Sequence, residues 1–321
     1  MKRLTLVLVL FLSLAAALTV SAQGAQPAPQ PTPQPPIILA DDLFARAGAA
    51  LEARNYDAAI RDYTLLIFLN PTFSQGYYGR ALSYFSQSAF ERALPDIARA
   101  LETAPNSIQY VQGIFALRAD IYTQQGDLDS AIADYDSIIA LNPDASSYAS
   151  RGLLRLNQDE FEAALSDMDE AIALAENEAV LYFYRAFIRA RMMDDTAAAS
   201  DLLRFVALNR TELTQNDPIT PGEVKVVALS QGMVHVIPFQ ASEGQTLSAI
   251  VGGEQGSTTD PLMILLAPDG TPIIADDDSG GGTTALLTDI PLTETGLYAL
   301  VVSHSLGGFD GAVGVRIELT D

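Results

Sequence analysis

Three consecutive aspartates, from Asp276 to Asp278, precede a serine and three glycines. Carboxylate and hydroxyl oxygens are the ligands that Ca²⁺ prefers, so Asp276 and Asp278 are candidate calcium ligands, with Asp260 or Asp310 as further oxygen donors. The spacing is not that of an EF-hand, because Gly280 stands where a third oxygen side chain is needed. The alternative, which we favour, is a solvated turn whose Asp and Ser side chains bond nearby backbone N–H groups.

Residues for catalysis are scarce. The chain has two histidines and no cysteine, which excludes a His-rich zinc site and a cysteine nucleophile. His304 has a serine on each side, but neighbouring residues on a strand point to opposite faces, so neither forms a Ser–His pair easily. The Gly-rich stretch after Asp278 is not followed by lysine and opens no helix, unlike a phosphate-binding loop. We therefore predict a protein that is not an enzyme and needs no cofactor.

The first half of the chain contains an internal repeat. Five segments align without gaps on an alanine column at Ala59, Ala93, Ala131, Ala164 and Ala198, with spacings of 34, 38, 33 and 34 residues. Upstream of each segment lies another helical stretch with its own small residue, at Ala47, Ala81, Ala119, Gly152 and Ala186. A period near 34 with helical patterning indicates stacked helix pairs, and small residues on both helices allow close approach.

At these residues the chain resembles the tetratricopeptide repeat family, over about Asp41–Arg210. The resemblance implies an α-solenoid that presents a concave face of first helices to a protein ligand. Family members that hold a peptide's carboxylate use lysine there. These repeats contain no lysine, so we do not expect that mode.

Two charged columns repeat in all five units. The arginines are Arg46, Arg80, Arg118, Arg151 and Arg185, and the aspartates are Asp62, Asp96, Asp134, Asp167 and Asp201. A ladder of arginines for ligand binding is one interpretation. We favour an Arg–Asp pair between the two helices of each unit, because packing columns should repeat whereas binding columns should vary.

Alignment of the units places large apolar side chains near the concave face. The candidate protein-binding residues are Phe44, Tyr78, Leu82, Phe85, Phe183 and Phe187. Such a face suits an extended or helical protein segment. The alternative is that several of these side chains belong to the core or cover the neighbouring domain.

Beyond Thr211 the pattern changes to eight short apolar runs separated by Gly, Asp or Pro, which predicts an antiparallel β-sandwich. The stretches FQASEGQTLSAIV, DPLMILLAPDGTPIIADDDSGGG and TETGLYALVVS resemble the bacterial pre-peptidase C-terminal domain. That resemblance implies a β-sandwich that accompanies exported proteins and sometimes binds surfaces or calcium. It does not imply a protease.

The N-terminus reads as an export signal. Lys2 and Arg3 precede an apolar run, and Val20-Ser21-Ala22 fits a cleavage site. The alternative is an uncleaved membrane anchor, because the apolar run is rather long. The absence of cysteine favours a bacterial exported protein over a disulfide-stapled one.

The chain without Lys2 and Arg3 retains 16 basic and 40 acidic residues, a net charge of −24. Such a surface repels phosphate backbones and anionic headgroups, which excludes nucleic acid and lipid as partners beyond an anchor.

The sequence thus predicts an α-solenoid of helix pairs followed by an antiparallel β-sandwich. The expected parts are a signal peptide at 1–22, a Pro-rich linker at 23–40, five repeats at 41–210, a linker at 211–222 and the sandwich at 223–321. The function we predict is that of a secreted, non-enzymatic scaffold for protein–protein interaction. The alternatives are a cell-surface adhesion module that binds through the sandwich, and an accessory subunit of a secreted hydrolase.

Overall fold

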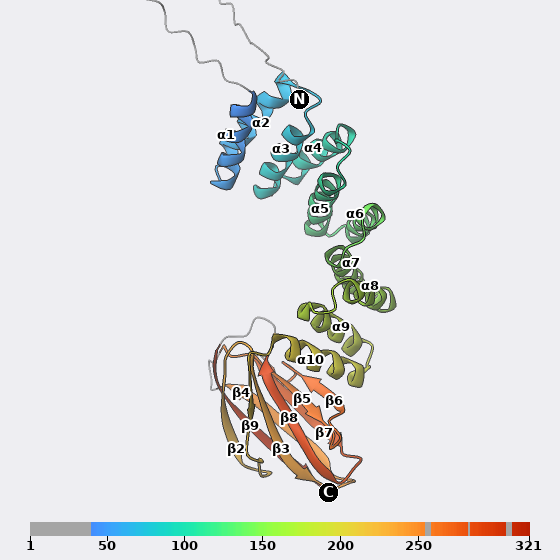
Figure 1. Cartoon of the computed structure of the whole chain (residues 1–321), viewed down its shortest axis with the longest axis vertical. Helices are drawn as coiled ribbons and strands as arrows, with labels where there is room; N and C mark the ends of the chain where they lie inside the picture. The colour runs from blue at the N-terminus through green and yellow to red at the C-terminus, as the bar shows by residue number, and fades with distance from the viewer. Residues whose placement is uncertain (1–39, 254–257, 282, 306–309) are drawn as a thin grey trace, which may run out of the picture. The chain divides into compact units, whose positions relative to one another are not determined.

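A computed structural model describes residues 40–253, 258–281, 283–305 and 310–321. The signal peptide and nearly all of the Pro-rich linker that we predict lie outside these ranges. The chain divides into two compact units, Met1–Gln124 and Gln125–Asp321. Figure 1 shows the helices and strands that they contain. Within the described ranges, no helix has the length and apolar character needed to cross a membrane.

The first unit consists of consecutive antiparallel helices. They are α1 (Ala40–Glu52), α2 (Tyr56–Leu69), α3 (Ser74–Ser86), α4 (Phe90–Glu102) and α5 (Ile108–Gln125). The alanines of the two small-residue columns, such as Ala47 and Ala59, are fully buried where the two helices of a pair meet. The burial of both alanine columns agrees with the close packing that we predict within each pair. Successive pairs also pack closely, because an added Cβ at Gly79 of α3 would stand 2.3 Å from the ring of Tyr63 on α2.

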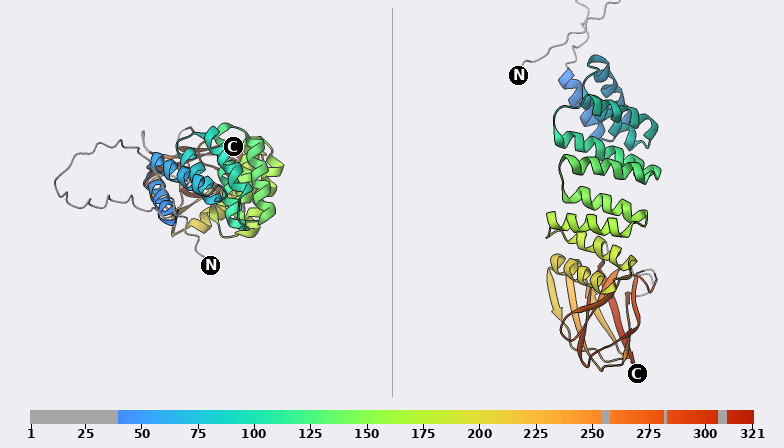
Figure 2. Two further views of the ribbon diagram at one scale, coloured as in Figure 1. Left: turned by 90° about the horizontal axis from the view of Figure 1, so that it is seen from above. Right: turned by 90° about the vertical axis from the view of Figure 1, so that its right-hand side faces the viewer.

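The second unit begins with α6 (Leu128–Leu141), α7 (Ala145–Asn157), α8 (Phe161–Leu174), α9 (Ala179–Arg191) and α10 (Asp195–Asn209). Figure 2 shows these helices stacked in sequence order, with α10 next to the strands. Polar caps fix several helix starts, because a side-chain oxygen accepts an otherwise unpaired N–H of the first turn. Asp127 accepts from Ser130 at α6, and Asp194 accepts from Ala197 at α10.

The turn between the two helices of each repeat uses one residue with positive φ. These residues are Arg54, Ser88, Gly126, Asp159 and Met193, with φ between 57° and 78°. They occupy a single column of the repeat. Only Gly126 adopts this backbone without steric cost, since a Cβ disfavours the left-handed region. The tight turn is thus imposed by the packing of the helix pair rather than by local sequence preference.

The strands form two sheets. One has the order β1-β3-β8-β5-β6 and the other has the order β2-β9-β4-β7. The bounds are β1 (Glu212–Gln215), β2 (Val224–Leu229), β3 (Met233–Ala241), β4 (Thr246–Gly253), β5 (Pro261–Leu266), β6 (Pro272–Asp276), β7 (Thr284–Pro291), β8 (Gly296–His304) and β9 (Gly311–Thr320). All pairs are antiparallel except β1 with β3, which is parallel.

The inner faces of the two sheets share one apolar core. Phe239 and Tyr298 stack at its centre with ring centroids 5.8 Å apart, and both side chains are buried. Met263 and Leu265 of β5 point into this core, in keeping with the two-residue alternation of a strand. The Tyr298 hydroxyl donates to the carbonyl of Glu294 at 3.0 Å, which satisfies its one polar group.

The outer face of the five-stranded sheet is also buried. Leu262 and Ile264, which alternate with the core residues of β5, belong to one cluster with Phe205 and Val206 of α10. Thr196 of α10 also donates from its hydroxyl to the carbonyl of Ile273 at 3.3 Å. The last repeat and the sandwich therefore share a hydrophobic core within the second unit.

The predicted fold class, helix pairs of an α-solenoid followed by a β-sandwich, is confirmed. The structure adds one strand: β1 lies in residues 211–222, which we predicted as a linker. Its four residues pair with β3, where the Asn216 N–H also donates to the carbonyl of Val236 at 2.9 Å. A stretch with few apolar residues becomes a strand here because a partner edge is available, which the local sequence does not reveal.

Candidate functional site

The Arg and Asp columns form ion pairs between the two helices of a repeat. In the pairs Arg46–Asp62, Arg80–Asp96, Arg151–Asp167 and Arg185–Asp201, Nε and Nη2 donate to the two carboxylate oxygens at 2.6–3.0 Å. The carboxylates are at most 5% exposed. Bidentate geometry of this kind suits a guanidinium and a half-buried carboxylate. The structural interpretation of the columns is confirmed for these four repeats.

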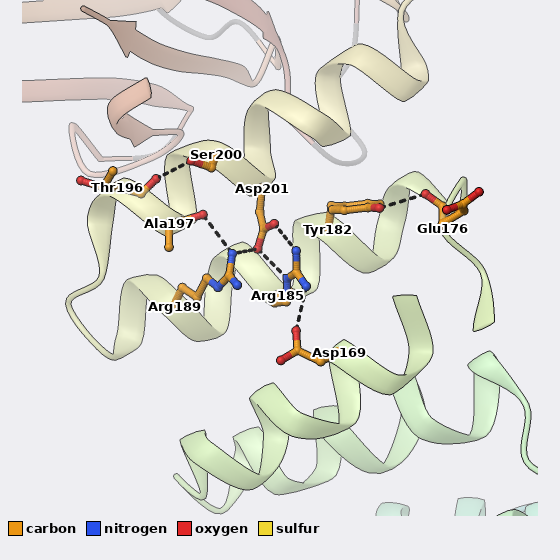
Figure 3. Close-up of polar contacts among 9 residues, drawn as sticks. All are labelled: Asp169, Glu176, Tyr182, Arg185, Arg189, Thr196, Ala197, Ser200 and Asp201. Atoms are coloured by element: carbon orange, nitrogen blue, oxygen red, sulfur yellow. Dashed lines mark hydrogen bonds and ion pairs between the residues drawn. The ribbon is translucent and has the colours of Figure 1, made fainter. Parts of the chain in front are cut away.

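The third nitrogen of the guanidinium reaches the preceding repeat. Nη1 of Arg185 donates to Asp169 of α8 at 2.7 Å (Figure 3). Arg151 makes the corresponding bond to Asp136 of α6 at 2.6 Å. One arginine therefore joins the two helices of its own repeat and the second helix of the repeat before it.

A second arginine completes the network in two repeats. Arg155 donates to Asp167 at 2.8 Å, and Arg189 donates to Asp201 at 2.7 Å, in each case one helical turn beyond the column arginine. Figure 3 shows Asp201 held between its two arginines. The sequence analysis missed these residues because only the last two repeats have them, although the i, i+4 spacing from the column arginine is a usable signal.

The electrostatics agree with a structural role. Hydrogen bonds and charge from Arg46 hold the pKa of Asp62 below its ordinary value of 3.8. The hydrogen bonds that Arg185 donates to Asp201 raise the pKa of Arg185. Because each guanidinium is occupied by carboxylates of the chain, these arginines do not form a ladder that waits for a ligand.

The candidate binding residues occupy three columns of the first helices, three residues before the small residue and one and four residues after it. We call this set the first-helix face. Its members are Phe44, Gly48, Leu51, Tyr78, Leu82, Phe85, Ala116, Asp120, Thr123, Ala149, Leu153, Leu156, Phe183, Phe187 and Ala190.

Four of the six candidate residues lie in the first unit. Phe44 of α1 contacts the rings of Tyr63 and Phe73, with centroids 6.2 and 5.4 Å away. Tyr78, Leu82 and Phe85 of α3 are half-buried against one apolar cluster formed with α4 and α5. The structure therefore brings the three α3 residues together and places Phe44 on the neighbouring pair.

The other two candidate residues lie on α9 in the second unit. Phe183 packs against Phe205 of α10, with ring centroids 5.3 Å apart, and is half-buried. Phe187 is 52% exposed, although it follows directly after the buried Ala186. Phe183 thus contributes mainly to the core, whereas Phe187 presents a large apolar surface to solvent.

The acidic loop holds its first aspartate in place. Asp276 accepts the backbone N–H of Leu286 at 2.7 Å and that of Ser279 at 3.1 Å, and it also accepts the Ser279 hydroxyl. These donors occupy the carboxylate of one candidate calcium ligand. The other, Asp278, is exposed. In the parts of the chain that the structure describes, no three His, Cys, Asp or Glu side chains are arranged to hold a metal ion.

Two other carboxylates, Asp277 of the loop itself and Asp260, have a raised pKa. Burial raises the pKa of Asp277, and the neighbouring Asp278 raises it further, while the Ser305 hydroxyl donates to Asp277 at 3.2 Å. Burial and Asp278 likewise raise the pKa of Asp260. The sequence analysis treated Asp277 only as a member of the acidic run, because burial of one among three neighbouring aspartates is a tertiary property.

The two histidines have different surroundings. Nε2 of His235 donates to the carbonyl of Ala228 at 2.8 Å, and Nδ1 lies 3.3 Å from the side-chain nitrogen of Asn216, so both ring nitrogens have a partner. His304 is 7% exposed, and its nearest acidic atom is an oxygen of Asp310 at 3.8 Å. Neither histidine lies within hydrogen-bonding distance of a serine hydroxyl in the described ranges, so the structure provides no Ser–His pair there.

Comparison with known families assigns the helical half. A family model described as "Tetratricopeptide repeat" matches residues 44–108 and 117–179. Within these ranges, the helix pairs from α1 to α8 match tetratricopeptide repeats. The matches cover parts of both units and agree with the first four of the five repeats that the sequence predicted.

Curated relatives share these repeats. Human tetratricopeptide repeat protein 13 is 26% identical over 135 residues, which are 40% of this chain and 15% of that protein. Human serine/threonine-protein phosphatase 5 is 30% identical over 104 residues, which are 32% of this chain and 20% of that protein. The chain therefore spans only a small part of the length of these relatives.

Among solved structures, MamA from Desulfovibrio magneticus RS-1 is 17% identical with a TM-score of 0.47, covering 53% of this chain and 94% of the other. YrrB, described as "a TPR protein with an unusual peptide-binding site", is 15% identical with a TM-score of 0.45, covering 53% and 86%.

Proposed function

We propose that this protein is an exported, non-enzymatic scaffold that binds an apolar protein segment on the first-helix face of its tetratricopeptide repeats. Repeats of this family fit protein–protein interaction, and they generally act without catalysis. The similarity to the phosphatase covers 20% of that enzyme, so its activity is not transferred to this chain.

One observation carries the proposal: the first-helix face is apolar apart from Asp120 and Thr123, and Phe187 is 52% exposed on it. Burial of a side chain of this size in a complex contributes about 1.5–3 kcal/mol. The arginines beneath the face are occupied by aspartates, so apolar contact supplies the affinity.

The test uses random peptides displayed on phage and selected on the full chain. Phe187→Ala, or Leu82→Ala in the first unit, should weaken the selected peptides by about tenfold, which corresponds to about 1.4 kcal/mol. Leu174→Ala is the matched control, because Leu174 lies on the second helix of its pair and is 53% exposed. If the Leu174 variant loses as much affinity as the others, or no peptide depends on either face residue, the proposal is wrong.

Export is part of the same proposal and is supported by the N-terminal pattern of Lys2, Arg3 and the apolar run that follows. Fusion of residues 1–22 to alkaline phosphatase, which is active only outside the bacterial cytoplasm, tests it. Export with cleavage before Gln23 is expected. A phosphatase that is exported but uncleaved would favour the membrane-anchored alternative. We also propose that the β-sandwich is a pre-peptidase C-terminal domain, the family that its sequence resembles.

A second candidate function is surface adhesion through the sandwich. On the four-stranded sheet, Val224, Val226 and Ile250 are 62%, 68% and 42% exposed. A shallow cavity of about 220 Å³ next to them is lined by Ile250, Leu286 and Arg316 among others. An apolar sheet face of this kind is typical of an interaction surface. Val226→Glu should release the protein from the cells that produce it if adhesion depends on this sheet, whereas Phe187→Ala should not.

A further inference from the structure

Asp120 is the one charged residue of the first-helix face. It lies on α5 directly after the buried Ala119, in the column that Leu82 occupies on α3 and Phe187 on α9. The sequence alignment of the repeats therefore contains this signal, but our search for large apolar residues passed over it. A single carboxylate on an otherwise apolar face is a specific feature that core packing does not require.

The surroundings of Asp120 are aromatic. Burial raises the pKa of the Tyr78 hydroxyl on α3, and the charge of Asp120 on the neighbouring first helix α5 raises it further. The Tyr78 ring packs edge-on against Tyr110 with centroids 5.6 Å apart, and its hydroxyl lies 3.4 Å from the carbonyl of Gly113. These contacts hold the Tyr78 ring against α5, the helix that carries Asp120.

Asp120 also differs from the column aspartates in its partners. Asp96 on α4 is held by Arg80 at 2.7 Å. For Asp120 the shift in pKa comes from burial, without a contribution from a basic side chain. Its side chain reaches solvent, yet enough protein surrounds the carboxylate that burial raises its pKa. A carboxylate in this setting gains most from a cation that arrives with a ligand.

We propose that the first-helix face of the first unit binds an apolar protein segment that places one lysine or arginine side chain on Asp120, beside the ring of Tyr78. This inference deepens the proposed function and rests on it. The carboxylate pairs with the cation, the ring face of a tyrosine attracts it, and Leu82 and Phe85 receive the flanking apolar side chains. A net charge of −22 on the chain also draws a basic segment toward it.

The experiment repeats the phage selection on the full chain and on the Asp120→Asn variant, under identical conditions. Peptides selected on the wild type should be apolar with one enriched lysine or arginine. Peptides selected on Asp120→Asn should stay apolar and lose that enrichment. A wild-type peptide should lose about tenfold in affinity for Asp120→Asn. Replacement of its lysine by norleucine should then cost little further affinity, because the two partners act as a pair.

Glu91→Gln is the matched control, since Glu91 is an exposed acid of α4 in the same unit and lies on the second helix. It should change affinity by less than about twofold. An unchanged melting temperature of Asp120→Asn verifies that the variant folds. If the selected peptides depend on Leu82 but show no basic enrichment, this inference is wrong while the proposed function stands. If no selected peptide depends on the face, both are wrong.

Discussion

Arg185 of α9 and Asp201 of α10 form a two-point ion pair, with nitrogen–oxygen distances of 2.8 and 2.6 Å. Asp201 is 3% exposed and accepts a third bond from Arg189. In the second repeat, Asp96 of α4 is held by Arg80, and Tyr84 stands at the position that Arg189 occupies in the last repeat. The same column position is therefore occupied by a doubly held carboxylate in one repeat and a singly held one in another.

The different numbers of arginine partners predict that removal of the column arginine lowers the free energy of unfolding more in the second repeat than in the last one. Arg80→Ala leaves Asp96 buried without a cation and should lower the free energy of unfolding by about 2–4 kcal/mol. Arg185→Ala should cost less, because Arg189 still neutralises Asp201. Urea denaturation followed by circular dichroism measures both, with hydrogen exchange assigning the loss to α3–α4 or α9–α10. Equal losses in the two variants would contradict a compensating role for Arg189.

The residues with positive φ in the repeat turns predict opposite changes in stability for Met193→Gly and Gly126→Ala in the second unit. Met193 has φ of 61° and is 89% exposed, so Met193→Gly removes backbone strain and little packing. It should stabilise the protein by about 0.5–1 kcal/mol. Gly126 has φ of 78° and no atom within 4 Å of an added Cβ, so Gly126→Ala should destabilise by about 1 kcal/mol through backbone strain alone. Melting temperatures provide the test, and a shift of the same sign in both variants would refute it.

The shared core of α10 and the five-stranded sheet can be tested on neighbouring residues of β5. Leu262 faces the helices and Met263 faces the sandwich core, and both are fully buried. Each alanine variant should lose about 2–5 kcal/mol. Leu262→Ala should accelerate hydrogen exchange in α10, whereas Met263→Ala should first loosen the strands. Faster exchange of α10 in Met263→Ala alone would show that the helix does not depend on the outer sheet face.

Because the pKa of Asp277 is raised in the folded state, ionisation of its carboxyl should destabilise the fold more as pH rises. A carboxyl whose pKa is higher in the folded state than the ordinary 3.8 stabilises the fold while it is protonated. That contribution is lost as pH rises through the folded pKa. Asp277→Asn cannot ionise, so its Tm should match the wild type near pH 3 and exceed it at pH 7.

Asp278→Asn is the control for this titration, because Asp278 is exposed. Its advantage at pH 7 should be smaller than that of Asp277→Asn. If Asp277→Asn lowers Tm equally at all pH values, the bond from Ser305 outweighs the cost of the buried charge.

The acidic loop should bind calcium weakly at most. Asp276 is already occupied by the N–H groups of Ser279 and Leu286, and a calcium site would have to replace those bonds. Calorimetry should use the full chain, since Leu262 and Ile264 would be uncovered in an isolated sandwich. We expect no saturable binding at moderate salt. A micromolar site abolished by the combined Asp276→Asn and Asp278→Asn substitutions would establish a metal site instead.

Sequence periodicity was sufficient to locate the repeats and most of the strands. Helical and strand periodicities are local, so a recurring alanine such as Ala59 and the apolar run around Met263 mark elements without knowledge of their partners. The Arg–Asp pairs were predictable for a related reason. The positions of Arg80 and Asp96 carry arginine and aspartate in all five repeats, because each helix pair is packed in the same way.

The partners of each face of a helix or strand could not be predicted in this way, because they depend on the folded chain. Leu262 and Met263 are both apolar, and the sequence cannot say that one faces α10 and the other the sandwich core. Asp96 and Asp120 are both helical aspartates, yet Asp96 is paired with Arg80, whereas the pKa of Asp120 is shifted by burial without a contribution from a basic side chain. Burial and charge pairing depend on residues distant in sequence, and therefore they appear only when the chain has folded.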